Sequence, residues 1–273
     1  MTKTIFITGS SSGLGRATAL LFASRGFKVI ATMRKSNDDA LEKTPNVTLL
    51  PLDVTDKAQI EAAAKKAIEL GGVDVLFNNA GSGIAGPLEG TTDEQLTRHI
   101  ETNLLGAIRT TQAFLPHFRE KRGGTIISTT SIAGLTAQPF DSLYHATKWA
   151  LEGWSESLSL ELAPFGIQVK SIAPGSVKTD FLTHMVVTSH PAYDAMVQRA
   201  FTIFTSPDYQ AGSSTAEEIA ETVYEAATDG KDQLRYVAGV DANAAYAQRL
   251  QLGPEAARMA TREQFFGAVP QMS

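Results

Sequence analysis

The sequence predicts an α/β fold built on a single doubly wound parallel sheet of the Rossmann type, with helices on both faces. Short β-branched runs alternate with longer amphipathic stretches from the first residues to about Val237, as expected for parallel strands joined by crossover helices. Neither an internal repeat nor a low-complexity linker interrupts this series. A glycine-rich turn separates the first apolar run from the first helical pattern, where such a sheet makes its first strand-to-helix connection.

Seven short runs are predicted as strands because they are rich in Val, Ile, Thr and Phe and are bounded by residues that favour turns. The first run leads into the glycine-rich turn, and the last one ends the alternating series. In chain order, the predicted strands are Thr4–Thr8, Phe27–Thr32, Val47–Leu52, Val73–Asn78, Gly124–Ser128, Ile167–Ala173 and Leu234–Val237.

Five amphipathic stretches between these runs are predicted as helices. Two of them have clear start signals. Thr92 precedes Gln95 by three residues and Thr215 precedes Glu218 by three, the arrangement of a capping box. The predicted helices are Leu14–Arg25, Ala58–Leu70, Asp93–Arg119, Leu143–Ala163 and Ala216–Thr228.

The stretch Thr179–Ser213 breaks the alternation, because it mixes residues such as Pro191 and Gly212 with apolar side chains. A long, partly apolar insert late in an α/β domain is expected to form a lid over a binding crevice. We therefore expect residues 1–240 to form one dinucleotide-binding catalytic domain that includes this lid. Residues 241–273 are expected to form a C-terminal extension, helical in parts, that packs on the same domain.

Composition and charge exclude several classes of function. The chain has 273 residues and no cysteine, which excludes disulfides, thiolate nucleophiles and zinc-thiolate sites. Its 24 Lys and Arg stand against 29 Asp and Glu, a formal charge of −5, and no long basic run offers the positive face that nucleic acid requires. No segment approaches the ~18 apolar residues that span a bilayer. We expect a cytoplasmic protein that binds neither nucleic acid nor membrane.

The turn after the first predicted strand has the spacing G-x-x-x-G-x-G and lacks the Gly-Lys-Ser/Thr of a P-loop. Glycines let a diphosphate approach the backbone, and the N–H groups that begin the next helix supply donors and a positive dipole end. A flexible Gly/Ser turn is the alternative, but the position between strand and helix favours a phosphate cradle. The residues expected to bind a dinucleotide here are Gly9, Ser11, Ser12, Gly13, Leu14 and Gly15.

The end of the second predicted strand bears on the choice of dinucleotide. An acidic residue there accepts hydrogen bonds from the adenosine ribose, whereas an arginine suits a 2′-phosphate. Here the strand ends with Arg34 and Lys35, and no carboxylate precedes Asp38. Arg34 therefore predicts a preference for NADP(H), with NAD(H) as the second choice. The alternative is that both cations are solvated turn residues.

Separated motifs in a fixed order carry a family resemblance over roughly Thr4 to Val237. The motifs are Thr8–Gly15, Asn78-Asn79-Ala80-Gly81, Ser131, Tyr144-x-x-x-Lys148 and Pro174-Gly175. On these residues the sequence resembles the short-chain dehydrogenase/reductase family, and most closely its hydroxysteroid and retinol dehydrogenase-like members.

The resemblance implies a catalytic set of four residues. Tyr144 and Lys148 are four positions apart, so a helix projects them from one face. By resemblance, Tyr144 is the general acid and base, and Lys148 together with the oxidised nicotinamide lowers the pKa of the phenol. Ser131 hydrogen-bonds the substrate oxygen, and Asn103 holds a water of a proton relay. Alone, each of these residues has a structural interpretation, and the neighbouring run Ser128–Thr130 offers other hydroxyls.

Further cofactor contacts are implied by the same resemblance. Asp53 is expected at the adenine amino group, although an aspartate there also makes a good turn or helix cap. The segment after the fourth strand borders the adenosine ribose, and the Pro174–Thr179 segment borders the nicotinamide. The implied residues are Asp53, Val54, Asn79, Ala80, Gly81, Pro174, Gly175, Val177 and Thr179, in addition to Tyr144 and Lys148.

Apolar lid residues suggest a lipophilic substrate. The expected pocket residues are Gln138, Phe140, His145, Phe181, Met185 and Phe204. Asp180, His184 and His190 form a faint metal pattern, but loose polar lid residues explain them better, so no metal is expected. Trp149 and Trp154 lie on the predicted Tyr144 helix, as core or subunit-interface residues, and the family packs this helix against its twin. A symmetric homo-oligomer, dimer or tetramer, is therefore expected.

The expected function is NADP(H)-dependent hydride transfer between the nicotinamide and a hydrophobic ketone or secondary alcohol, as in a carbonyl reductase or alcohol dehydrogenase. An NADP(H)-sensing regulatory protein that retains the fold is the alternative. A serine hydrolase is disfavoured because the chain has no G-x-S-x-G elbow.

Overall fold

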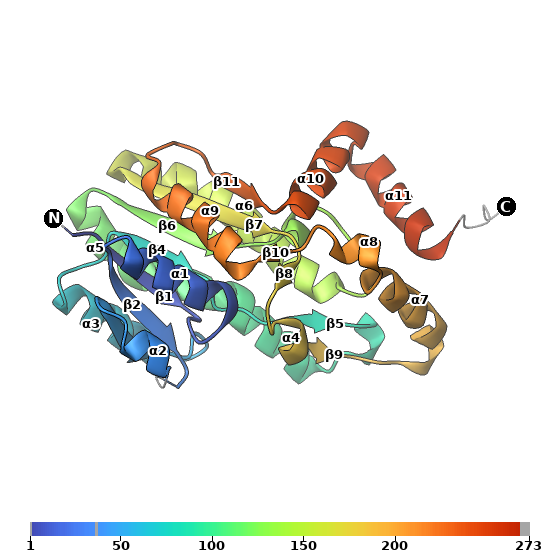
Figure 1. Cartoon of the computed structure of the whole chain (residues 1–273), viewed down its shortest axis with the longest axis horizontal. Coiled ribbons are helices and arrows are strands. Elements are labelled where there is room, and N and C mark those ends of the chain that lie inside the picture. The colour runs from blue at the N-terminus through green and yellow to red at the C-terminus, as the bar shows by residue number, and fades with distance from the viewer. Residues whose placement is uncertain (1, 36–37, 268–273) are drawn as a thin grey trace.

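A computed structural model describes residues 2–35 and 38–267. Its central sheet has seven strands in the order β11-β7-β6-β4-β1-β2-β3, and every neighbouring pair is parallel (Figure 1). The strands are β1 Thr4–Thr8, β2 Lys28–Met33, β3 Val47–Pro51, β4 Val75–Asn78, β6 Gly124–Thr129, β7 Ile167–Pro174 and β11 Arg235–Ala238. The chain leaves β1 toward β2 and returns to β4 on the other side, so the strand order reverses at β1. The predicted doubly wound sheet is confirmed.

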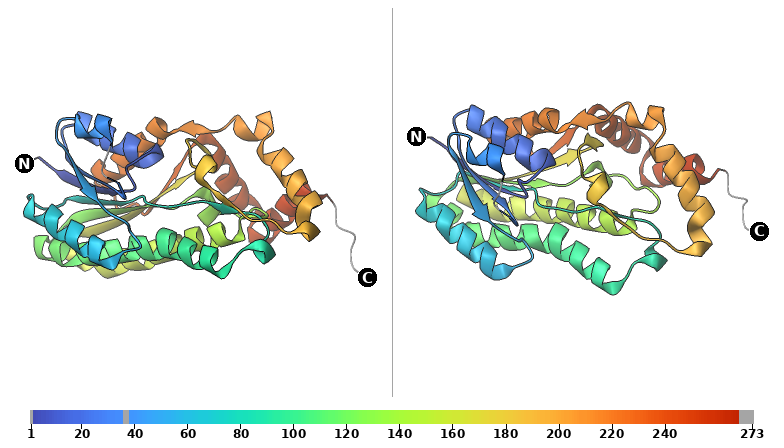
Figure 2. Two further views of the ribbon diagram at one scale, coloured as in Figure 1. Left: turned by 90° about the horizontal axis from the view of Figure 1, so that it is seen from below. Right: turned by 60° about the horizontal axis from the view of Figure 1, so that its bottom comes forward.

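Helices cover both faces of the sheet (Figure 2). On one face lie α1 and α9, and on the other α3, α5 and α6. Alternate residues of β1 serve the two layers: Ile5 and Ile7 belong to the core under α1 and α9, whereas Phe6 packs with Phe114 of α5. These helices are α1 Gly13–Ser24, α3 Lys57–Glu69, α5 Gly106–Lys121, α6 Ser142–Leu162 and α9 Ala216–Thr228.

The single helix predicted over Asp93–Arg119 has a different form. Helix α4 (Asp93–Ile100) runs into a π-helical segment at Glu101–Leu105, and α5 follows without a break. A π-helical turn inserts an extra residue into the helix, and buried Asn103 occupies it. Both predicted capping boxes, at Thr92 and Thr215, are confirmed.

The lid contains regular structure that periodicity did not predict. Within it, β9 (Val186–Val187) pairs with β5 (Ile84–Ala85), and the two strands that flank it, β8 (Val177–Lys178) and β10 (Ser214–Thr215), pair with each other. Helices α7 (Asp194–Phe204) and α8 (Pro207–Gln210) lie between β9 and β10 in the chain. Outside the lid, the short helix α2 spans Asp39–Glu42, near the other end of the molecule. Single 3₁₀ turns occur at Leu88–Gly90, Ile132–Gly134, Ala163–Phe165, Leu182–His184 and Pro191–Tyr193.

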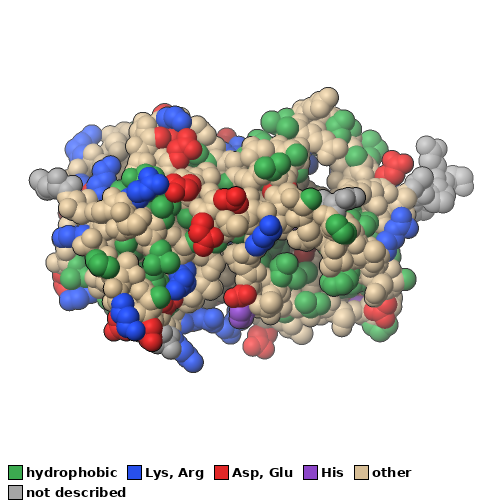
Figure 3. Space-filling view, in the orientation of Figure 1, with side chains coloured by type: hydrophobic (Ala, Val, Ile, Leu, Met, Phe, Trp, Pro, Cys, Tyr) green, Lys and Arg blue, Asp and Glu red, His purple; other side chains and the backbone are tan. Residues whose placement is uncertain are grey.

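The C-terminal extension forms helices α10 (Val240–Leu252) and α11 (Pro254–Phe266). Helix α10 follows β11 directly, and α11 packs on the lid helix α7, with the rings of Phe204 and Phe265 5.1 Å apart. Figure 3 shows hydrophobic side chains gathered over the end of the molecule that holds these helices. Among the described helices, none combines the length and the apolar character needed to cross a membrane.

Candidate active site

The glycine-rich turn packs too closely for side chains. A Cβ atom on Gly15 would lie 2.2 Å from the carbonyl oxygen of Gly9, and one on Gly9 would lie 2.7 Å from the Cα of Ala80. Gly9 also has a left-handed φ of +71°, which favours glycine. The glycines therefore leave the backbone at the start of α1 without side chains, and this fits the close approach of a dinucleotide's diphosphate.

Asn79 joins the carboxyl ends of three neighbouring strands. Its side-chain nitrogen donates to the carbonyl oxygens of Thr8 and Gly9 at 3.1 Å, and its side-chain oxygen accepts from Thr129 at 3.1 Å. The backbone N–H groups of Asn79 and Ala80 both donate to the Thr8 hydroxyl. This segment thus fixes the backbone next to the glycine-rich turn.

The structure separates the hydroxyls that follow β6. Thr129 donates to Asn79, and Thr130 donates to the carbonyl oxygen of Ile172. The Ser131 side chain lies close enough to Tyr144 to lower the pKa of its phenol, and the Ser131 hydroxyl accepts from the N–H of Ala133 at 3.1 Å. The family resemblance named Ser131 among these hydroxyls, and Ser131 is the one placed at Tyr144.

Tyr144 and Lys148 lie one turn apart on α6. Lys148 is buried; its Nζ donates to the carbonyl oxygen of Thr129 at 2.9 Å and lies 5.5 Å from the centre of the Tyr144 ring. Burial lowers the pKa of Lys148 to about 8, so the ammonium persists at neutral pH.

Burial raises the pKa of Tyr144 to about 12, although the hydrogen bond from Ser131 opposes the rise; the Asp141 carboxylate adds to it. Lys148 is not among the groups that shift this pKa in the protein alone, and its expected lowering of the pKa together with the oxidised nicotinamide stays a prediction. The phenol is neutral, which is the form that donates a proton.

Asn103 holds the backbone of Ser82. Its side-chain oxygen accepts from the Ser82 N–H, and its nitrogen donates to the Ser82 carbonyl oxygen, both at 2.8 Å. The same nitrogen lies 3.2 Å from Nε2 of buried His99, whose ring is 6.1 Å from that of Tyr144. Burial, with the Lys148 ammonium nearby, lowers the pKa of His99 to about 4, so the ring is a neutral acceptor. Asn103 is thus placed beside the Tyr144 site.

The predicted adenosine end lies at β2 and β3. Arg34 is exposed after β2, whereas Arg16 is paired with Asp38 at 2.9 Å. The Asp53 carboxylate accepts from the N–H and hydroxyl of Thr55, the turn interaction that was the alternative for this residue. Val54 is buried against Gly106.

The segment after β7 returns to the glycine-rich turn. The N–H of Gly175 donates to Ala238 of β11 at 3.0 Å, and Val177 pairs with Ser214. Thr179 then lies against Gly13, where a Cβ would be 3.3 Å from its methyl group. The expected diphosphate and nicotinamide segments, far apart in sequence, are therefore neighbours, with Pro174 at the end of β7.

The six predicted pocket residues fall into separate places. Phe181 and Met185 lie over Gly83, and the Phe181 ring is 6.2 Å from that of Tyr144. Phe140 and Phe204 pack instead against Phe266 and Phe265 of α11.

The polar pair of the predicted pocket is engaged with the protein. Gln138 donates to the hydroxyl of Tyr209. Buried His145 contacts the Ala133 carbonyl oxygen through Nδ1 at 2.6 Å and accepts from the Gln138 N–H through Nε2 at 3.1 Å. Both ring nitrogens are thus used to hold the loop that carries Ser131, and the structure gives His145 a place different from the expected one.

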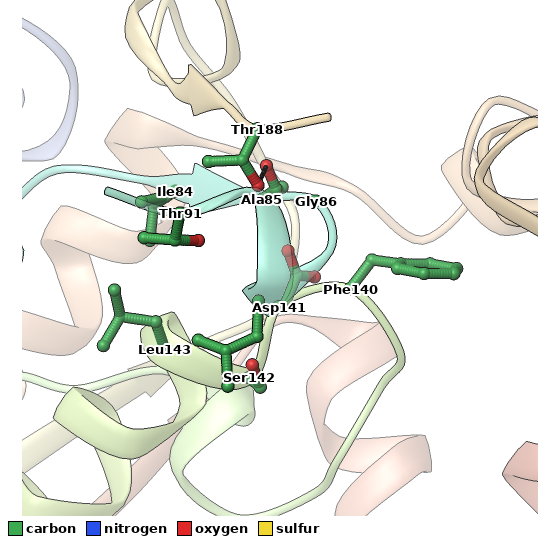
Figure 4. A pocket seen from close by; sticks show the side chains of 10 residues that line it. Ile84, Ala85, Gly86, Thr91, Phe140, Asp141, Ser142, Leu143 and Thr188 are labelled. Atoms are coloured by element: carbon green, nitrogen blue, oxygen red, sulfur yellow. Dashed lines mark hydrogen bonds between the residues drawn. The ribbon is translucent and has the colours of Figure 1, made fainter. Parts of the chain in front are cut away.

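A small pocket opens at the first turn of α6, beside β5 (Figure 4). Its lining residues are Ile84, Ala85, Gly86, Leu88, Thr91, Phe140, Asp141, Ser142, Leu143 and Thr188. The Asp141 carboxyl lies beneath the Ala85–Gly86 backbone, whereas the Phe140 ring points away from the other lining side chains. Burial raises the pKa of Asp141 to about 7.

Sequence reasoning missed His99, Ser82 and Asp141. His99 precedes Asn103 by four positions, a spacing that places the two on one helix face and could have identified it. Ser82 and Asp141 carry no such signal.

Of the faint metal pattern, His184 contacts the Asp180 carbonyl oxygen and His190 lies 3.5 Å from Glu89. In residues 2–35 and 38–267, no three His, Asp or Glu side chains are placed to hold a metal ion.

Comparison with known proteins agrees with this geometry. The family model for short chain dehydrogenase matches residues 3–189. Human 17-beta-hydroxysteroid dehydrogenase type 1 is 34% identical over 250 residues, covering 85% of this chain and 76% of the human protein. A short-chain dehydrogenase structure from Streptomyces avermitilis has a TM-score of 0.82 at 31% identity and covers 96% of both chains. ElxO with NADP bound has a TM-score of 0.75 at 26% identity, covering 91% of this chain and 100% of ElxO.

These similarities confirm the resemblance that was based on the glycine-rich turn, the Asn79 segment and the Tyr144–Lys148 pair. The chain belongs to the short-chain dehydrogenase family of oxidoreductases.

Proposed function

We propose that the protein is an NADP(H)-dependent carbonyl reductase or alcohol dehydrogenase that acts on a hydrophobic ketone or secondary alcohol. The observation that carries this proposal is the convergence of the Ser131 hydroxyl, the neutral Tyr144 phenol and the Lys148 ammonium beside the bare glycine-rich turn. NADPH, when bound, supplies the hydride. The protein has to supply the proton and stabilise charge on the substrate oxygen.

Each of the three side chains has a defined part in reduction. The Ser131 hydroxyl donates to the carbonyl oxygen, where negative charge develops. The Tyr144 O–H gives its proton to that oxygen as the alcohol forms, and Lys148 stabilises the phenolate left behind. In oxidation the proton returns to Tyr144. The Asn103 side chain holds the Ser82 backbone, and His99 lies next to Asn103. Together they keep the π-helical segment in place beside Tyr144 and Lys148.

The expected hydrophobic substrate is supported by what faces Tyr144. Phe181, 38% exposed, lies across from the phenol, and Met185 lies beside it over Gly83. Apolar surface of this kind favours an apolar ligand next to a few polar groups. Human 17-beta-hydroxysteroid dehydrogenase type 1, by its name a dehydrogenase of hydroxysteroids, agrees with such a substrate.

The cofactor preference depends on Arg34. Arg16 is engaged with Asp38, so exposed Arg34 is the cation that we place at the 2′-phosphate. ElxO binds NADP and is consistent with this choice.

Arg34→Ala is expected to raise the Kd for NADPH about tenfold, which corresponds to the loss of roughly one charge-assisted hydrogen bond, and to leave the Kd for NADH unchanged. Fluorescence titration with both nucleotides measures this. Lys65→Ala, which removes the same charge from exposed α3, is the control; equal weakening of NADPH in both variants would contradict the assignment.

The proposed reaction is tested by following NADPH absorbance with a panel of steroid, aliphatic and aryl ketones, and NADP⁺ with the matching alcohols. Turnover should be greatest with bulky apolar carbonyls. NADPH binding without turnover across the panel would contradict the proposal and favour a nucleotide-sensing protein.

A further inference from the structure

Asp241, in the first turn of α10, reaches back to the segment that follows β7. Its Oδ2 accepts from the N–H of Ser176 at 2.7 Å. The carboxylate lies where side chains of two glycines would be: a Cβ on Gly175 would lie 2.2 Å from Oδ1, and a Cβ on Gly212 would lie 2.8 Å from the Cβ of Asp241. Glycines from two distant segments thus leave the space that this carboxylate fills.

The other carboxylate oxygen is unusual. Oδ1 of Asp241 is buried and has no hydrogen-bond partner among residues 2–35 and 38–267. The Oδ2 atom, in contrast, is bonded to the Ser176 N–H, so the carboxylate is oriented toward the segment that follows β7.

Ser176 is held from both sides. The Asp241 carboxylate accepts a hydrogen bond from the Ser176 N–H, and the N–H of Ser214 donates to the Ser176 carbonyl oxygen at 2.9 Å. The chain continues into β8 and then to Thr179, which lies against Gly13 of the glycine-rich turn. Helix α10 of the C-terminal extension and β10, the strand that follows the lid, therefore both bind the turn between β7 and β8.

We propose that Asp241 is a positioning residue that fixes the Pro174–Val177 turn against the nicotinamide half of the cofactor. The proposal rests on the proposed function, because that function places the nicotinamide beside this turn. It gives the C-terminal extension a role in the active site, because α10 supplies the hydrogen-bond acceptor that holds the turn in position. Asp241 acts through the Ser176 N–H and does not touch the reacting atoms.

A stabilising role for Asp241 at the N-terminus of α10 is the competing explanation, because a carboxylate there also favours the helix dipole. Asn243 provides a matched control. It lies in the same helical turn, and its side chain caps the backbone by donating to the carbonyl oxygens of Val237 and Gly239, without reaching Ser176.

The test compares two ligands on the full chain: NADPH, and adenosine 2′,5′-bisphosphate, which has the adenosine half alone. Asp241→Ala is expected to raise the Kd for NADPH about tenfold and to change the Kd for the bisphosphate less than about twofold. Asp241→Asn retains an acceptor for Ser176 and should stay within about threefold of the wild type for both ligands. Asn243→Ala should lower the melting temperature without separating the two ligands.

Equal weakening of both ligands in Asp241→Ala, or unchanged NADPH binding, would overturn the positioning role and leave the proposed function intact. Should Asp241→Ala not fold, a Kd for NADPH in Asp241→Asn that rises together with that for the bisphosphate would also overturn it. A wild type that binds neither ligand would overturn the proposed function and this inference with it.

Discussion

Tyr144→Phe is expected to lower kcat for carbonyl reduction by about 10²- to 10⁴-fold, the usual contribution of a positioned general acid. The phenol is the acid in the proposed reaction, and burial holds its pKa at about 12, so it is fully protonated at neutral pH. The variant removes one oxygen atom and leaves the ring that faces Phe181 and His99. The Kd for NADPH should therefore change less than about twofold. Stopped-flow absorbance with a ketone from the panel measures the rate, and fluorescence titration measures the Kd.

Tyr224→Phe is the matched control for this variant. Tyr224 packs against Phe22 and Phe27 under the opposite side of the sheet, far from α6 in the fold. Its hydroxyl is not part of the proposed reaction, so kcat should be unchanged. A Tyr144→Phe variant that keeps more than about a tenth of the wild-type kcat would refute the role of Tyr144 as the acid.

Lys170→Met is expected to lower the free energy of unfolding by about 3–5 kcal/mol, because it removes the buried cation of the Asp229 carboxylate and leaves only the more exposed Lys231, 3.7 Å away. Lys170, 1% exposed on β7, donates to Asp229 at 2.8 Å and to the Tyr236 hydroxyl at 3.2 Å. Tyr236 also donates to Asp229 at 2.6 Å. For a chain of this size the loss corresponds to a fall in Tm of about 10 °C, measurable by calorimetry. Lys57→Met, which removes an exposed partner of Glu61, should leave the Tm nearly unchanged.

The same network gives stability a defined pH dependence. Burial by itself would raise the pKa of Asp229, but hydrogen bonds from Lys170 and Tyr236 outweigh it and lower the pKa to about 2. An unfolded aspartate titrates near pH 3.9, so between these values the unfolded state binds more protons. The stabilisation is therefore complete above about pH 4 and is lost as pH falls toward 2. Chemical denaturation from pH 6 to 2 should show this loss in the wild type, and a smaller one in Lys170→Met. An equal acid response in both proteins would contradict the assignment.

Local sequence patterns were sufficient to predict the sheet, its parallel strands and the first glycine-rich turn. These features depend on local patterns: β-branched runs, amphipathic stretches and glycine spacing act over a few residues and survive in the folded chain. The capping boxes at Thr92 and Thr215 formed as predicted for the same reason. The spacing of Tyr144 and Lys148 on one helix face also followed from helix geometry alone.

Contacts between distant side chains, in contrast, follow from the tertiary structure. It turned Phe140 and Phe204 toward the C-terminal helix and left Phe181 at the phenol. It also brought Asp241 to Ser176, 65 positions away. Such contacts depend on how distant segments pack, and burial then sets the pKa values of the buried groups, so no local pattern in the chain encodes them.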